Sequence, residues 1–309
     1  MTTEQKILSP GPDAEGQRLD LWVGEALGLS RARLKRLFDA RGVRVAGKVA
    51  KKGDKVRAGL EVAVALEEEQ LAATASTDLP LHLLHEDAWL LAVEKPSGVP
   101  SHPLKPGEVG TVANALVARF PECQGASDDP REGGVCHRLD VETSGILLAA
   151  RDRETWQAVR AAFSARDVEK RYWALVTGPL AEEGEIDLPL RHPLRHADRM
   201  EGAPEGGKDA REAISRFRVL DRAADYAFVD VEILTGVQHQ IRAHLAAVGA
   251  PLVGDALYRG REEPGLSRFF LHAHRLGVTH PRTGARLTVD SPLPEALRAV
   301  LTAHGLSSP

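Results

Sequence analysis

The chain has 309 residues, of which 43% are hydrophobic and 27% charged, as in ordinary folded globular proteins. Its two cysteines exclude a disulfide-rich framework and favour a reducing compartment. The sequence begins without the basic-then-apolar build of a signal peptide, and it contains no apolar run of membrane-spanning length. We therefore expect a cytoplasmic protein that does not enter membranes, with a monomer as the default state.

The net charge of −4 conceals one strongly basic segment. Between Arg31 and Arg57, eleven Lys and Arg residues stand against two acidic ones, so this segment carries +9 and the rest of the chain −13. A local field of one sign can bind phosphates even on an acidic protein. The alternative is a solvated basic face without a partner. The candidate RNA-binding residues are Arg31, Arg33, Lys35, Arg36, Arg44, Lys48, Lys51 and Lys52.

Four segments follow one another along the chain. Residues 1–16 are polar and contain Pro and Gly, so we expect them to be disordered. A small domain follows over residues 17–66. Residues 67–80 lose all periodicity and are predicted to link it to a second domain over residues 81–305.

The small domain combines amphipathic helices with short strands. Leu34, Leu37 and Phe38 share one face of a helix whose other positions are largely Lys and Arg, and Ser30 is its candidate N-cap. Alternating segments separated by glycines predict a small hairpin after it. The predicted elements are helices at 18–29 and 31–41 and strands at 43–45 and 60–64.

The second domain alternates strands and helices irregularly. Strands succeed one another without a helix between each pair, which predicts the α+β class with a mixed, mostly antiparallel sheet flanked by helices. The stretch 191–209 is polar and basic and is expected to be a loop. The predicted strands are 81–85, 89–94, 145–150, 170–177, 212–220, 226–234, 269–276 and 285–290, and the predicted helices are 109–119, 152–165, 238–248 and 293–303.

The segment HRLDVETSGILLAA at 137–150 is the most informative part of this domain. A short polar loop carries Arg138 and Asp140 to the beginning of an apolar strand, Ile146 to Ala150. Catalytic carboxylates are often held on such a loop, clamped by a rigid element. Taken alone, the four-residue string HRLD is more typical of an Arg–Asp pair that closes a turn.

Further segments of the chain make the functional interpretation of the HRLD string more specific. Together with it, HEDAWLLAVEKPSGVPSHP (85–103), KRYWALVTG (170–178), REAISRFRVL (211–220) and LTGVQHQIRAHLAAVGAPLVGDALY (234–258) resemble, in order, the motifs of the RluA-type pseudouridine synthases. The string LSRARLKRLFDARGVRVAGKVAKKGDKVRAG (29–59) is similar to the S4 RNA-binding domain, although Ala46 replaces a common Asn. The resemblance spans about residues 18–303.

The resemblance implies an enzyme that cuts the N1–C1′ bond of a uridine and rejoins the base through C5. No redox step occurs and no outside group enters, so neither a cofactor nor a metal is expected. The reaction needs a carboxylate near C1′ and C2′, as nucleophile or as base, and the resemblance assigns this to Asp140. It further implies that Tyr172 stacks on the base, Arg138 fills the space that the extruded nucleotide leaves, Arg242 pairs with Asp140, and Leu271 lines the pocket.

One departure from the family pattern leaves alternatives open. The family usually has Arg-Thr where this chain has Val237-Gln238, which puts some RNA contacts in doubt. Large-subunit ribosomal RNA is the expected substrate by analogy with members that carry an S4 domain. The alternatives are a transfer-RNA synthase and a non-catalytic RNA-binding or assembly protein. A metal-dependent hydrolase that uses some of the twelve histidines is a weaker alternative, because no HExxH motif or cysteine pair accompanies them.

Overall fold

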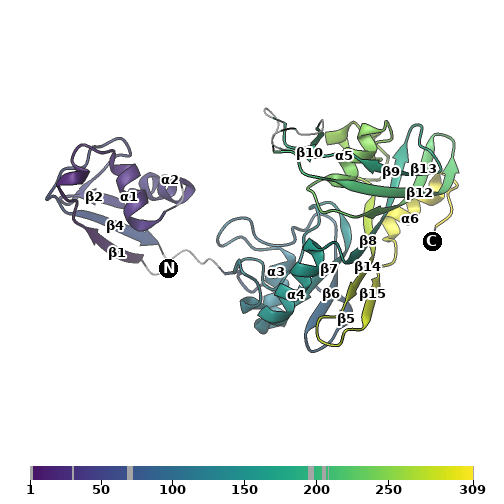
Figure 1. Ribbon diagram of the computed structural model, residues 1–309, viewed down its shortest axis with the longest axis horizontal. Coiled ribbons are helices and arrows are strands. Elements are labelled where there is room, and N and C mark those ends of the chain that lie inside the picture. Colours follow the sequence, from purple (N-terminus) through teal and green to yellow (C-terminus); the bar gives the residue numbers. More distant parts are fainter. Residues whose placement is uncertain are drawn as a thin grey trace. The chain divides into compact units, whose positions relative to one another are not determined.

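The computed structural model describes residues 3–29, 31–67, 72–193, 198–203, 207 and 209–308. The chain divides into two compact units, Met1–Glu69 and Gln70–Pro309, and each is described by itself (Figure 1). The division falls within the segment expected to be a linker. From Ala73 on, however, that segment packs on the second unit: Ala73 is 5% exposed, and the Ala73 N–H donates to the Pro130 carbonyl at 3.0 Å.

The first unit has two helices beside a small antiparallel sheet. Leu19 and Val23 on one helix and Leu34 and Phe38 on the other are buried, as the amphipathic spacing predicts. Ser30, the candidate N-cap, lies outside the described residues. The elements are β1 (Thr3–Leu8), η1 (Pro12–Ala14), α1 (Leu19–Leu27), α2 (Arg31–Asp39), β2 (Val43–Val45), β3 (Lys48–Val49) and β4 (Val62–Glu67), with the sheet order β1-β4-β2-β3.

The prediction that residues 1–16 are disordered was wrong for the described part of this segment. Residues Thr3–Leu8 form β1 and pair antiparallel with all six residues of β4, from Thr3↔Glu67 to Leu8↔Val62. The partner is supplied by backbone groups of β4, which would otherwise be an unpaired strand edge. Such pairing requires no apolar periodicity in the added strand, so the polar composition of this segment did not reveal it.

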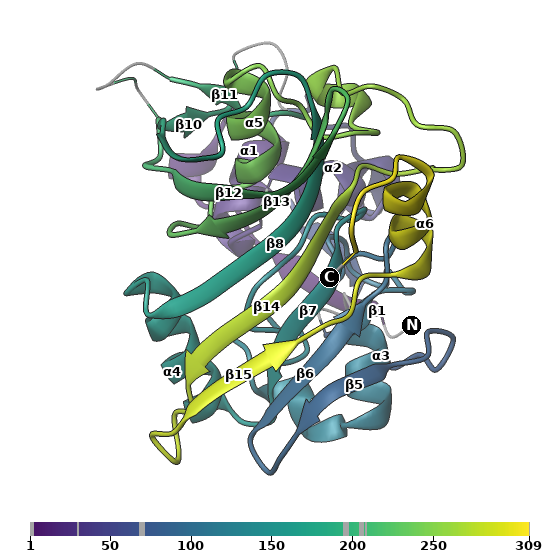
Figure 2. The ribbon, with the colours of Figure 1, turned by 90° about the vertical axis from the view of Figure 1, so that its right-hand side faces the viewer.

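The second unit is built on one large sheet, which confirms the predicted α+β class (Figure 2). The strand order is β5-β6-β7-β14-β8-β13-β12-β9, with β15 paired to β14, and β7–β14 is the parallel pair among the described strands. The strands are β5 (His82–Glu86), β6 (Leu90–Lys95), β7 (Ser144–Ala150), β8 (Val168–Thr177), β9 (Glu183–Asp187), β10 (Leu190–Arg191), β11 (Glu201–Gly202), β12 (Ile214–Ala223), β13 (Tyr226–Ile233), β14 (Leu271–Thr279) and β15 (Arg286–Asp290). The helices are α3 (Val112–Arg119), α4 (Arg153–Ser164), α5 (Gln240–Ala247) and α6 (Glu295–Ala303), and η2 (Pro121–Gly125) and η3 (Ala256–Tyr258) are 3₁₀ turns.

Alternating side chains of the central strands point into different parts of the core. Leu91 and Leu147 cluster with α3 residues, whereas Leu90 and Leu148 cluster with Trp156 of α4. All seven residues of β7 are buried, which explains why its sequence is a continuous apolar run. A rigid, fully buried strand therefore begins four residues after Asp140.

The sheet contains one long-range connection that brings the C-terminal part of the chain to its centre. β14 lies between β7 and β8, with Ala273 opposite both Gly145 and Tyr172. Gly145 has φ +118°, and a Cβ there would lie 2.2 Å from the Ala273 carbonyl oxygen, so only glycine fits this close approach. This pairing places the start of β14 beside the loop that carries Asp140.

The loop expected at 191–209 contains short strands at both of its ends. β10 and β11 pair through Leu190↔Gly202 and Arg191↔Glu201, while residues 194–197, 204–206 and 208 of this stretch lie outside the described residues. β9 was not predicted, because Glu183–Asp187 alternates only weakly and lies at the sheet edge. Across the described parts of the chain, none of the helices has the length and apolar character needed to cross a bilayer.

Candidate active site

The loop that carries Asp140 is fixed on both sides by hydrogen bonds. On one side, Ser101 Oγ accepts from the Leu139 N–H at 3.1 Å and donates to the Leu139 carbonyl at 3.3 Å. On the other, Lys95 Nζ donates to the Val141 carbonyl at 2.8 Å. The Asp140 carbonyl closes a turn by accepting from the Thr143 N–H at 3.0 Å. The Asp140 side chain, 22% exposed, is thereby held at one position with an open side.

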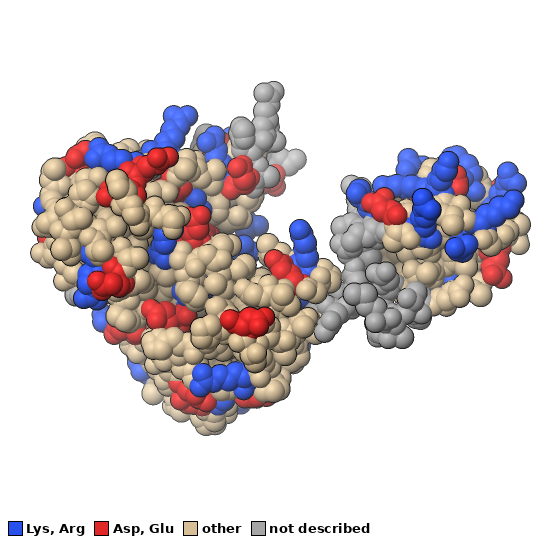
Figure 3. All heavy atoms as spheres, turned by 180° about the vertical axis from the view of Figure 1, so that it is seen from behind, with Lys and Arg blue, Asp and Glu red and all other residues tan. Residues whose placement is uncertain are grey.

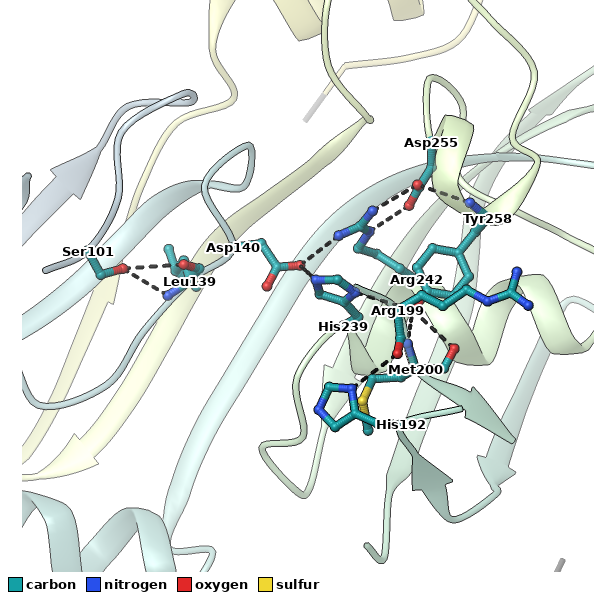
Figure 4. Close-up of polar contacts among 10 residues, drawn as sticks. All are labelled: Ser101, Leu139, Asp140, His192, Arg199, Met200, His239, Arg242, Asp255 and Tyr258. Carbon is teal, nitrogen blue, oxygen red and sulfur yellow. Dashed lines mark hydrogen bonds and ion pairs between the residues drawn. The ribbon is translucent and has the colours of Figure 1, made fainter. Parts of the chain in front are cut away.

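Arg242 contacts Asp140, as the resemblance implied (Figure 4). Its Nη1 lies 3.3 Å from Asp140 Oδ2, although the two residues are 102 positions apart in the sequence. The same guanidinium makes two shorter hydrogen bonds to Asp255, from Nε at 2.6 Å and from Nη2 at 2.9 Å. Asp255 is 1% exposed, so this bidentate pair anchors Arg242 and leaves Nη1 for Asp140.

Aromatic rings hold the rest of the Arg242 side chain. The Phe269 ring centre lies 4.3 Å from Arg242 Cζ and the Tyr258 ring centre 5.1 Å. Burial alone would lower the pKa of Arg242, but the Asp255 and Asp140 carboxylates outweigh it and raise that pKa above its usual value. The guanidinium is therefore a permanent positive charge beside the Asp140 carboxylate.

Tyr172 and Leu271 lie together on neighbouring strands of the same cleft. Tyr172 is 8% exposed, and burial followed by the nearby Asp140 charge raises the pKa of its hydroxyl, so the phenol stays protonated. Leu271 is 3% exposed and begins β14. Arg138 is exposed and lines the same cleft. The structure therefore gathers Arg138, Asp140, Tyr172, Arg242 and Leu271 at one place.

The cleft consists of two adjoining hollows of about 270 and 460 Å³. The smaller contains His102 and Phe269, and the larger contains Tyr172 and Leu271. Asp140 lines both hollows, so the carboxylate is at their junction. The other residues common to both are Arg138, Leu139, Gln238, His239 and Arg242.

His239 and Asp255 belong to the site but were missed by the sequence analysis. His239 has φ +53° and precedes α5, and its Nε2 lies 3.9 Å from Asp140 Oδ2 while its Nδ1 lies 3.3 Å from Tyr258 Oη. Burial lowers the pKa of this imidazole, although Asp140 acts in the opposite direction. His239 and Asp255 both lie within the motif at 234–258, where the sequence alone gives them no role. The position of His239 directly before the Arg242 helix was the available signal.

The candidate RNA-binding residues of the first unit are exposed wherever their side chains are described. Lys35 pairs with Asp39 at 3.1 Å, and Arg44 donates to the Gly47 carbonyl at 3.1 Å. Figure 3 shows Lys and Arg gathered over the visible face of this unit. The side chains of Arg31, Arg33 and Arg36 lie outside the described ones, and the remaining exposed candidates are Lys48, Lys51 and Lys52.

Histidines do not gather as a metal centre in the described part of the chain, where no three His, Cys, Asp or Glu side chains are placed to hold an ion. His272 Nδ1 instead contacts Ser144 Oγ at 2.9 Å, and His274 Nε2 contacts Asp230 Oδ1 at 3.1 Å. The His274 ring also stacks on Trp173, with ring centres 4.0 Å apart. His272 and His274 therefore serve as hydrogen-bonding and stacking partners of other buried side chains.

Comparison with known proteins connects this geometry to a family. The family model described as RNA pseudouridylate synthase matches residues 89–247. A ribosomal large subunit pseudouridine synthase D from Xanthomonas campestris is 35% identical, over 94% of this chain and 90% of that protein. The protein of the same name from Nitrosomonas europaea is 36% identical, over 93% of this chain and 84% of that protein.

A solved structure agrees with these sequence matches. The human RNA pseudouridylate synthase domain containing 4 superimposes with a TM-score of 0.60 at 25% identity, covering 74% of this chain and 94% of that one. The sequence matches extend over both units, and the structural match covers a part of the chain large enough to contain the sheet and the cleft. The chain therefore belongs to the RluA-type RNA pseudouridylate synthase family and is an isomerase of that kind.

Proposed function

We propose that this enzyme converts specific uridines of large-subunit ribosomal RNA to pseudouridine, with Asp140 as the catalytic residue. The observation that carries the proposal is the Asp140–Arg242 pair at the junction of the two hollows. The choice of ribosomal RNA rests on relatives about one-third identical over more than 90% of this chain, whose name specifies the ribosomal large subunit.

Asp140 has two possible roles, and both need an ionised carboxylate with free space beside it. As a nucleophile it attacks C1′ while the N1–C1′ bond breaks; as a base it removes the proton from C2′. In the first route the base turns, C5 bonds to C1′ and the Asp140–C1′ bond breaks; in the second, the base turns, C5 bonds to C1′ and Asp140 returns the proton to C2′. In both routes C5 then loses its proton and N1 gains one, so atoms balance without an added reactant. Arg242 supports both roles because its hydrogen bond holds the Asp140 carboxylate in place at the junction of the two hollows.

The remaining cleft residues fit the handling of an extruded nucleotide. A uridine in a folded RNA must leave its stack before its ribose can reach Asp140. The flat ring of Tyr172 and the apolar side chain of Leu271 offer surfaces for the displaced uracil. Arg138 is exposed at the mouth and can occupy the emptied position in the RNA.

The first unit is proposed to be an S4-like RNA-binding domain. Its two helices, its small sheet and its exposed Lys and Arg residues support this assignment. Such a surface neutralises phosphates without reading sequence, and it would deliver the second unit to structured RNA.

One experiment tests the substrate and the catalytic assignment together. Purified protein is incubated with unmodified large-subunit ribosomal RNA and, separately, with unmodified transfer RNAs, and pseudouridine is mapped by carbodiimide labelling. We expect new signals at discrete uridines of the ribosomal RNA. Signals confined to transfer RNA would show that transfer RNA, and not ribosomal RNA, is the substrate. The absence of signal on every RNA would favour the non-catalytic alternative.

A further inference from the structure

Two lysines of the second unit are buried, and they differ in how their ammonium groups are satisfied. Lys95, at the end of β6, is 0% exposed. Its Nζ donates to the carbonyls of Pro96 at 2.9 Å, Val99 at 2.7 Å and Val141 at 2.8 Å. Every N–H of this ammonium therefore has a backbone partner, and Lys95 is a structural clamp of the Asp140 loop.

Lys170 has no comparable set of partners. It lies in β8 and is 7% exposed. In the part of the chain that the structure describes, its Nζ makes one hydrogen bond, to the Thr235 carbonyl at 2.9 Å, and lies 5.9 Å from the Phe163 ring centre. Burial, and then the charge of Arg166, lower the pKa of Lys170 to about 8. No carboxylate acts to raise it, so this buried charge lacks a counterion among the described residues.

The surroundings of Lys170 favour an anion. Lys170 and Tyr172 lie two positions apart on the same face of β8, and both line the larger hollow. Arg138, Arg160 and Arg211 line it too. Among the described residues of this lining, Asp140 is the single carboxylate, and it already faces Arg242. A buried cation in a cationic hollow is compensated by a charged ligand, whereas a neutral uracil carbonyl would leave the charge uncompensated.

We propose that Lys170 binds an oxygen of the RNA phosphate adjoining the target uridine, and that Arg160 and Arg211 flank this phosphate at the rim. The inference rests on the proposed action on RNA and adds a second anchoring point beside the base-stacking surface of Tyr172. Lys170 is a binding residue in this scheme and takes no part in bond breaking. Its unused N–H donors and its unpaired charge are the features that a phosphate would satisfy.

The test uses RNA oligonucleotides that span a uridine mapped in the experiment above. The phosphate on one or the other side of that uridine is replaced by an uncharged methylphosphonate. For the wild-type protein we expect KM to rise by about tenfold or more at one of the two positions, because a charge-assisted hydrogen bond is lost. On unmodified RNA, the Lys170→Met variant should already have the KM that the wild type shows with the methylphosphonate. Introducing the methylphosphonate should not raise the KM of this variant further. The Lys170→Arg variant should have a KM between those of the wild type and Lys170→Met.

Two controls separate this proposal from a structural role and from general charge effects. Arg153→Met removes one exposed positive charge of α4 that does not line the hollow, and it should leave KM unchanged. Lys170→Met should fold with a Tm equal to or above that of the wild type, because removing an unpaired buried charge relieves its desolvation. An unfolded Lys170→Met protein would assign the residue a structural role and overturn the proposal.

The pH dependence gives a further check. The charged and titratable groups around Lys170 are Arg166, Arg160 and His137, and His137 stays neutral because burial, Lys170 and Arg160 lower its pKa to about 3. The protonated lysine binds phosphate, so the KM advantage of the wild type over Lys170→Met should be full well below pH 8 and should shrink as the pH rises through about 8. A bound phosphate will move that loss to higher pH.

Each outcome of the oligonucleotide test has a distinct meaning. Equal responses of wild type and Lys170→Met to both methylphosphonates would overturn the phosphate assignment. A Lys170-dependent loss seen only when 4-thiouridine replaces the target would instead place the uracil carbonyl at Lys170. Absence of wild-type turnover on every RNA would contradict the proposed function itself, which is measured first and independently.

Discussion

The two units carry their charges in opposite ways. In the first, Lys48, Lys51 and Lys52 are exposed, and their side chains project into solvent. In the second, Arg242 and Asp255 are buried, and each atom of the pair has a fixed partner. Exposed charges act through a shared field that salt screens, whereas buried charges act through specific contacts. The first unit is therefore suited to binding RNA and the second to catalysis. Substitutions in the first unit should change RNA affinity, and substitutions in the second should change kcat.

The Asp140→Asn variant should separate turnover from RNA affinity most strongly. The amide keeps the size of the side chain but can neither attack C1′ nor remove a proton, so turnover should fall by about 1000-fold or more. RNA affinity should stay within about twofold of the wild-type value, because the basic surfaces are unchanged. Single-turnover assays and filter binding measure the two quantities. Parallel loss of both would mean that Asp140 maintains the fold.

The Asp255→Asn variant tests whether chemistry in the second unit depends on the anchoring of Arg242. The variant leaves a buried guanidinium without its bidentate partner, which should cost about 3 kcal/mol of unfolding free energy and lower kcat with little change in KM. Urea unfolding and steady-state kinetics test this. The matched control is Asp225→Asn, because Asp225 forms an exposed pair with Arg261 and its substitution should leave the unfolding free energy nearly unchanged. Equal effects of the two substitutions would contradict the anchoring role of Asp255.

Neutralising Lys48, Lys51 and Lys52 together should affect only binding. We expect affinity for RNA to fall by about tenfold at low salt, and the slope of log affinity against log salt to become about 2 units shallower. The kcat of the bound enzyme should not change. Binding measured between low and moderate salt decides the point, since an unaltered slope would show that these lysines do not meet phosphates.

The smallest effect is expected from Ser101→Ala. The variant leaves the buried N–H and carbonyl of Leu139 without their hydroxyl partner, at a cost of about 1 kcal/mol, and should lower kcat by about fivefold through a less fixed Asp140 loop. Thr302→Ala on α6 removes a similar hydroxyl, bonded to the Arg298 carbonyl, and should leave kcat unchanged. A kcat at the wild-type level in both variants would indicate that other contacts, such as that of Lys95, position the loop.

Local patterns in the sequence predicted most of the elements of both units. The apolar run after Asp140 identified β7, and the alternating residues around Tyr172 identified β8, because burial on one or both faces leaves a direct trace in composition. β1 left no such trace, since it is held by backbone pairing with β4. The edge strand β9 was missed for a related reason, because its side chains are mostly exposed.

The site was only partly predictable for a different reason. Arg138 and Asp140 lie two positions apart in one motif. His239 approaches Asp140, and Asp255 binds Arg242, through tertiary contacts that no spacing rule encodes. Lys170 was read only as part of a strand motif. Its significance depends on burial and on the absence of a counterion among the described residues, and both are properties of the assembled sheet.

The position of β14 has a consequence for how the enzyme matures. Strands β7 and β8 are neighbours in sequence, yet β14, nearly one hundred residues beyond β8, stands between them and brings Leu271 to the cleft. Without Leu271–Thr279, the loop that carries Asp140 and the strand that carries Tyr172 have no shared neighbour to hold them together. The cleft therefore takes its shape only when Leu271–Thr279 has joined the sheet.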